Sequence, residues 1–112
     1  SREVWVCGPG AFVVLKALAF KGRGENKDAY DLYYLIRNFG KGVEDVVASL
    51  RPLLGDAEAK QAIEVLRSDF LDHNGTGPRR VAEFLLGRVD DDIQADVVGF
   101  IKQLLDRCGP LV

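Results

Sequence analysis

A cluster of three basic and two acidic side chains is the part of this sequence whose residue types and spacing suggest chemistry. Its members are Lys16, Arg23, Lys27, Asp28 and Asp31. Lys16 interrupts the run 11–20, in which the other nine residues are apolar. A buried ammonium group costs several kcal/mol unless it is paired or reaches water. We therefore expect Lys16 to meet a carboxylate or a bound anion.

The two aspartates are the natural partners for Lys16. Asp28, Asp31, Leu32 and Leu35 follow the i, i+3, i+4, i+7 spacing of one helical stripe. Both carboxylates therefore lie on the face that carries core leucines. A short Gly-rich linker separates this predicted helix from the one that contains Lys16, so we expect the two helices to be antiparallel neighbours.

Two interpretations of this cluster follow from the residues alone. In the first it is structural, because acids in a first turn stabilise a helix through its dipole by a few tenths of a kcal/mol and a lysine near a helix end reaches solvent along its own side chain. In the second it is an anion or nucleotide site, because perturbed charges gather at functional sites. The sequence leaves both open.

The segment 16–33 reads KALAFKGRGENKDAYDLY. It resembles the pattern K-x-x-A-x(n)-R-x-x-x-K/R-D-x-x-D-L in the helical region of nucleotidyltransferase-like proteins. The similarity is greatest to the AbiEii-type toxins of abortive-infection and toxin–antitoxin systems and their uncharacterised relatives.

This resemblance implies that Lys16, Arg23 and Lys27 bind nucleotide phosphates and that Asp28 and Asp31 orient Lys16. In that family a preceding sheet carries G-S-x(n)-D-x-D, whose aspartates hold Mg²⁺. No such segment occurs in these 112 residues. We therefore assign no catalytic residue and no metal ligand here.

The same resemblance makes the chain the C-terminal part of a longer nucleotidyltransferase-like protein. We expect Mg²⁺ and a nucleoside triphosphate to be bound by that parent protein and the chain alone to be inactive. The implied partners are the missing N-terminal nucleotidyltransferase domain and an antitoxin or another protein. The alternative function is a non-catalytic helical protein-interaction module.

Periodicity predicts one mainly α domain over residues 1–112, a bundle of five or six helices preceded by one short β-strand at Glu3–Cys7. We interpret Gly8, Pro9 and Gly10 as a turn and Asn26 as a helix N-cap. The expected helices cover about 10–21 and 27–38, a segment from 43 that bends or ends at Arg51, and segments that start near 56, 76 and 90.

Composition narrows the function classes. The net charge of −2 argues against a dominant nucleic-acid-binding face, but it leaves a local basic patch and nucleic-acid binding open. No membrane span or signal peptide is visible, and Cys7 and Cys108 lack metal or redox spacing, so we expect reduced thiols, a cytoplasmic location and no membrane partner.

Three further groups of residues have side chains of a chemically reactive or ligand-binding type. Asp69, Asp72 and His73 are either a metal site or a solvated helix end. Arg79 and Arg80 occupy a first helical turn that the dipole disfavours, which marks a possible anion or partner contact. Tyrosines at 30, 33 and 34 either stack on a base or belong to the core and its margin.

Overall fold

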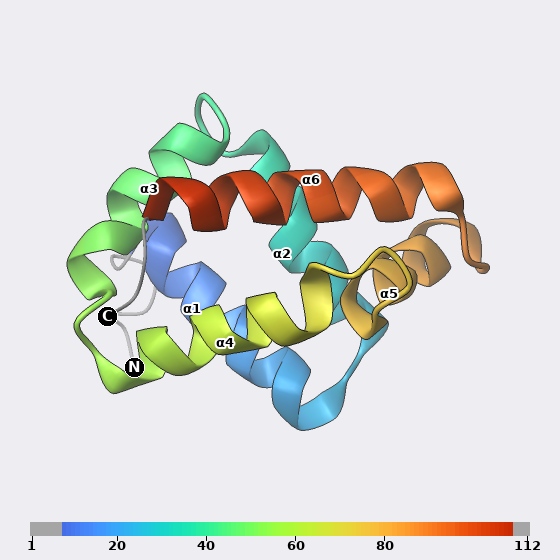
Figure 1. Cartoon of the computed structure of the whole chain (residues 1–112), viewed down its shortest axis with the longest axis horizontal. Coiled ribbons are helices and arrows are strands. Elements are labelled where there is room, and N and C mark those ends of the chain that lie inside the picture. The colour runs from blue at the N-terminus through green and yellow to red at the C-terminus, as the bar shows by residue number, and fades with distance from the viewer. Residues whose placement is uncertain (1–7, 109–112) are drawn as a thin grey trace.

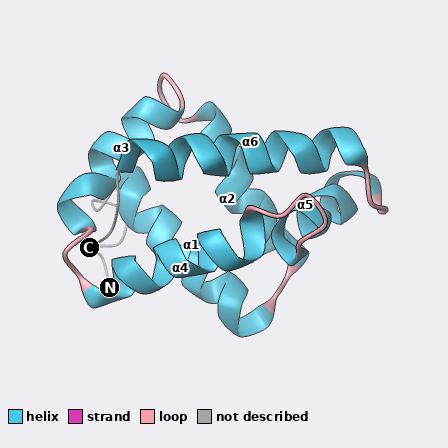
Figure 2. Cartoon of the chain, in the orientation of Figure 1, coloured by secondary structure: helices cyan, strands magenta, loops and turns pink. Residues whose placement is uncertain are grey.

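The computed structural model describes residues 8–108, which form six α-helices and one 3₁₀ helix. In chain order these are α1 (Gly8–Arg23), α2 (Asn26–Asn38), α3 (Val43–Leu50), η2 (Arg51–Leu53), α4 (Ala57–Phe70), α5 (Thr76–Leu86) and α6 (Asp91–Cys108). Loops and turns join them directly (Figure 2). The mainly α fold and the helical bundle are confirmed. The predicted strand at 3–7 lies outside the described residues.

One hydrophobic core holds the bundle together. Each α-helix buries one apolar stripe, as its periodicity predicts. Fully buried members include Val13, Leu32, Ile36, Leu50, Leu66, Phe70, Val81, Val97, Ile101 and Leu104. α6 runs along the long axis of the molecule (Figure 1), and it contacts α2, α3, α4 and α5. Because the core draws on every α-helix, no single pair of helices accounts for it.

The first helix begins earlier than the sequence predicts. Gly8, Pro9 and Gly10 are helical, so their interpretation as a turn is wrong. Pro9 is tolerated because a first-turn N–H has no partner within the helix. The Gly10 N–H donates to Ser49 Oγ at 2.8 Å, which brings the start of α1 against α3. Close backbone approach, rather than a turn, accounts for this glycine.

A tight connection joins α1 to α2. Gly24 has φ +65°, and its N–H donates to the Phe20 carbonyl at 2.6 Å, which closes α1. Glu25 is the extended N-cap of α2, and Asn26 is already helical, so the predicted cap at Asn26 is wrong by one residue. The left-handed glycine ends one helix so abruptly that a single residue remains before the next helix. The predicted packing of the two helices against each other is confirmed.

A polar network joins α6 to α2, and a local cap starts α6. The Tyr33 hydroxyl donates to the Asp96 carboxylate and accepts from Arg37 at 2.9 Å. Burial, followed by the bond to Asp96, raises the pKa of Tyr33 to about 12. At the start of α6, Asp90 Oδ2 accepts from the Ile93 N–H at 3.0 Å. This cap confirms that the helix starts at the predicted acidic triplet.

Gly10→Ala should destabilise the fold by about 1–3 kcal/mol through overpacking. A Cβ atom at Gly10 would lie 2.6 Å from the backbone carbonyl of Ser49, which cannot move without displacing α3. Gly22→Ala, in the same helix with nothing within 4 Å of its added Cβ, should instead stabilise by about 0.5–1 kcal/mol. Urea unfolding of both variants checks this, and equal effects would contradict it.

Candidate functional site

The five charged residues singled out in the sequence lie together where α1 faces α2. We call Lys16, Arg23, Lys27, Asp28 and Asp31 the charge cluster. Lys16 Nζ lies 2.8 Å from Asp31 Oδ2 and 3.5 Å from Asp28 Oδ1. Arg23 Nη2 lies 3.0 and 2.9 Å from the two oxygens of Asp28, and Lys27 Nζ lies 2.9 Å from Asp31 Oδ2. The structure therefore brings every predicted site residue into one network.

The five side chains of the charge cluster are exposed to different extents. The Asp28 side chain is only 4% exposed and that of Asp31 is 17% exposed. Lys16 is 25% exposed, whereas Arg23 and Lys27 are 59% and 67% exposed. The carboxylates thus lie inside and the cations outside. Three cations on two carboxylates leave one surplus positive charge at an open surface.

These contacts determine the protonation states of Lys16 and Asp31. The hydrogen bond to Asp31 raises the pKa of Lys16, against a smaller lowering by burial. Burial alone would raise the pKa of Asp31, but hydrogen bonds from Lys16 and Lys27 outweigh it and lower the pKa below its ordinary value of 3.8. Both groups are therefore charged at neutral pH.

Each carboxylate of the cluster has two cationic partners. Asp28 contacts Lys16 and Arg23, and Asp31 contacts Lys16 and Lys27. Loss of Lys16 therefore leaves neither aspartate alone. The Lys16 ammonium also lies 5.6 Å from the ring centroid of Phe12 on its own helix. This redundancy holds the cations in place without making Lys16 indispensable to the fold.

One contact of the cluster was missed from the sequence. Arg23 is the cation that holds both oxygens of the buried Asp28, a role that the helical stripe did not indicate. The signal was present in the linker, because an arginine that ends one helix lies close to the first turn of the next when two residues separate them. The Lys27–Asp31 pair has ordinary i, i+4 spacing and was readable in the sequence.

The acidic segment near His73 does not form a metal site. His73 Nε2 lies 3.1 Å from Asp91 Oδ1, and Asp72 accepts from the Asn74 N–H at 3.1 Å. Within residues 8–108 no group of three or more His, Cys, Asp or Glu side chains could hold a metal ion. Asp28 and Asp31 do not suit Mg²⁺ either, because three cations already neutralise them.

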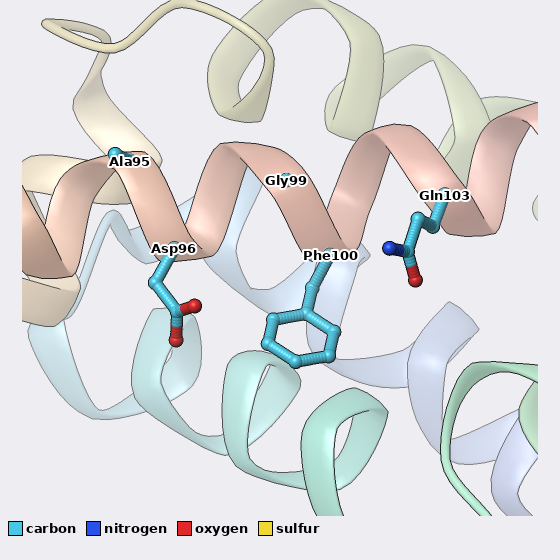
Figure 3. A pocket seen from close by; sticks show the side chains of 5 residues that line it. All are labelled: Ala95, Asp96, Gly99, Phe100 and Gln103. Carbon is cyan, nitrogen blue, oxygen red and sulfur yellow. The ribbon is translucent and has the colours of Figure 1, made fainter.

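Two surface hollows are too small to enclose a substrate. One, of about 130 Å³, is lined by Thr76, Arg79, Arg80 and Glu83. The other, of about 180 Å³, lies on α6, where Asp96 and Phe100 extend on the same side of the helix (Figure 3). Ligand pockets commonly reach about 300–1,000 Å³. Neither hollow includes a residue of the charge cluster, whose Arg23 and Lys27 side chains are 59% and 67% exposed.

Comparisons of the chain with protein-family models, curated proteins and solved structures found no match. The resemblance to nucleotidyltransferase-like proteins thus rests on segment 16–33 and stays a prediction. In the described part of the chain, no helix combines the length and apolarity needed to cross a bilayer.

Asp28→Asn should destabilise the protein by about 1–3 kcal/mol, because it leaves two cations around a buried neutral amide. Asp31→Asn should cost less than about 1 kcal/mol, because Asp31 is more exposed and its cations reach water. Chemical denaturation of the two variants measures the difference. Equal losses would show that burial of Asp28 does not govern the cluster.

Acid should destabilise the wild type partly through Asp31. Its pKa in the folded protein is lower than the ordinary value of 3.8, so its stabilising contribution is present above about pH 4 and is lost as the pH falls through the folded pKa. Asp31→Asn should flatten the decline of the unfolding free energy below pH 4. Unfolding curves between pH 5 and pH 2.5 check this, and identical slopes would contradict it.

Proposed function

We propose that this chain is the helical C-terminal domain of a nucleotidyltransferase-like protein of the AbiEii type and completes its nucleotide site. The observation that supports this function is the charge cluster, in which three cations converge on two largely buried carboxylates at an open surface. The surplus positive charge suits an anionic ligand. The cluster also consists of the residues that carry the resemblance.

Lys16, Arg23 and Lys27 are the phosphate-binding residues in this proposal. Each lysine ammonium has three donors, more than its contacts with the aspartates use. Arg23 contacts Asp28 through Nη2, which leaves Nη1 and Nε for phosphate oxygens. Cations that are already oriented stabilise charge that develops during phosphoryl transfer without further reorganisation.

Asp28 and Asp31 are the orienting residues. Asp28 fixes Arg23 from within the helix interface, and Asp31 holds Lys16 and Lys27 side by side. Their role is to position the cations and not to bind metal. Mg²⁺ belongs to the preceding domain with its G-S-x(n)-D-x-D segment, which would also supply a further wall and the attacking geometry. An antitoxin is the further protein partner that this assignment implies.

Lys16→Gln should weaken binding of tripolyphosphate to the chain severalfold, since it removes one of three converging charges. In the parent protein it should lower nucleotidyl transfer by about 10²–10³-fold. Lys60→Gln is the matched control, because Lys60 is an exposed lysine on α4, outside the cluster. Calorimetry and labelled-nucleotide transfer provide the two measurements. Full transfer activity in Lys16→Gln would refute this role.

A second candidate function is a non-catalytic helical protein-interaction module. It is favoured by the exposed apolar side chains of Phe84, Leu85, Leu86 and Val89 at the end of α5. In this case the charge cluster only joins α1 to α2. Size-exclusion chromatography of the wild type and Leu86→Asp tests self-association through this surface, because a monomer at all concentrations with no effect of the substitution counts against it.

A further inference from the structure

Helices α2 and α5 pack against each other. Arg80 Nη1 on α5 lies 3.5 Å from Asn26 Oδ1 on α2. Four residues later on both helices, the Tyr30 and Phe84 rings stack with centroids 4.6 Å apart and planes at 22°. Both contacts join residues of the two helices, so the Tyr30 and Phe84 rings lie where α2 packs on α5.

Three aromatic rings adjoin one another there, of which Tyr30 and Phe84 are stacked and Tyr34 is tilted against Tyr30. Tyr34 lies next to Tyr30 with centroids 5.8 Å apart and planes at 38°, and Tyr30 stacks in turn on Phe84. We call Tyr30, Tyr34 and Phe84 the aromatic stack. Its two outer members are 56% (Tyr34) and 44% (Phe84) exposed, whereas the central Tyr30 is partly covered.

Packing of α2 on α5 explains Tyr30 but not the exposure of Tyr34. The neighbouring Tyr33 shows what a structural tyrosine does in this fold, because it is almost fully buried and its hydroxyl is bonded to α6. Tyr34 instead presents a large apolar ring to water, and it extends the stack beyond the helix interface. An exposed π-face of this kind suits a ligand with a flat ring.

The aromatic stack is close to the charge cluster on the same face of α2. Tyr34 is seven residues after Lys27, which is about two turns and ~10 Å along the helix axis. Asp31, which holds Lys16 and Lys27, lies between them on that face. The surface therefore changes from cationic to aromatic over a distance comparable with that between the terminal phosphate and the base of an extended nucleoside triphosphate.

We infer that Tyr34 stacks on the base of the nucleotide whose phosphates bind Lys16 and Lys27, with Tyr30, itself stacked on Phe84, beside its ring. This inference rests on the proposed function and adds a base-positioning residue to it. The phosphates complement the surplus positive charge, and the uncovered ring face complements the base. A net charge of −2 disfavours a long nucleic-acid strand as the occupant, and the ligand proposed here is a mononucleotide. Stacking tolerates any base.

Calorimetric titration of the whole 112-residue chain tests this with two kinds of probe. ATP, GTP, CTP and UTP carry base and phosphates, whereas tripolyphosphate carries phosphates alone. Tyr34→Ala should weaken nucleotide binding about tenfold and leave tripolyphosphate binding unchanged. Tyr34→Phe should bind like the wild type, because it keeps the π-face. Phe39→Ala is the control, since Phe39 is another exposed aromatic next to α2 that lies outside the aromatic stack.

Each outcome separates this inference from the proposed function. Nucleotide binding that is unchanged in Tyr34→Ala but reduced in Lys16→Gln overturns the stacking and keeps the phosphate site. No binding of either probe to the chain overturns the inference, whereas the proposed function, in which the preceding domain completes the site, is tested by the transfer activity of Lys16→Gln in the parent protein. Tyr34-dependent binding of a single-stranded oligonucleotide without binding of mononucleotides also overturns the inference, in favour of a strand as the occupant.

Discussion

The buried carboxylate of Asp28 is the constraint on which the arrangement of the first two helices depends. An unpaired charge at this depth would cost several kcal/mol, so α2 can pack on α1 only in a register that brings a cation to it. Lys16 and Arg23 meet this demand from two positions on α1. Such a pair contributes more to the choice of register than to net stability, because its Coulombic gain is offset by desolvation.

In that register, side chains of α2 contact three neighbouring helices. Asp28 and Asp31 face α1, Tyr30 packs on α5, and Tyr33 reaches Asp96 on α6. Tyr34 lies beside Lys27 and Asp31 at the outer edge of the side that faces α1 and is left to solvent. A rotation of α2 that improved one of these contacts would break the others. The position of the exposed ring relative to the cations is therefore a consequence of packing elsewhere in the bundle.

The spacing of apolar residues was enough to predict the helices. The shared helical stripe of Asp28 and Asp31, together with the short linker before it, was enough to predict their contact with Lys16. The local sequence did not predict the helical position of Gly10, because this glycine packs against Ser49, a residue far away in the chain. The Tyr33–Asp96 bond and the pairing of α2 with α5 were missed for the same reason. Contacts between distant segments leave no periodicity in either one. The resemblance, which assigns roles rather than contacts, is a different kind of prediction that geometry alone does not test.

The structural and functional interpretations of the charge cluster are not exclusive. To hold α1 on α2, one cation for each carboxylate would be enough, for example Arg23 on Asp28 and Lys16 on Asp31. Lys27 goes beyond this requirement, and it is the most exposed of the three cations. Its charge must be balanced by solvent ions or by a ligand. A cluster whose anions are buried while Arg23 and Lys27 are exposed presents positive charge at the surface, as the proposed phosphate-binding role requires.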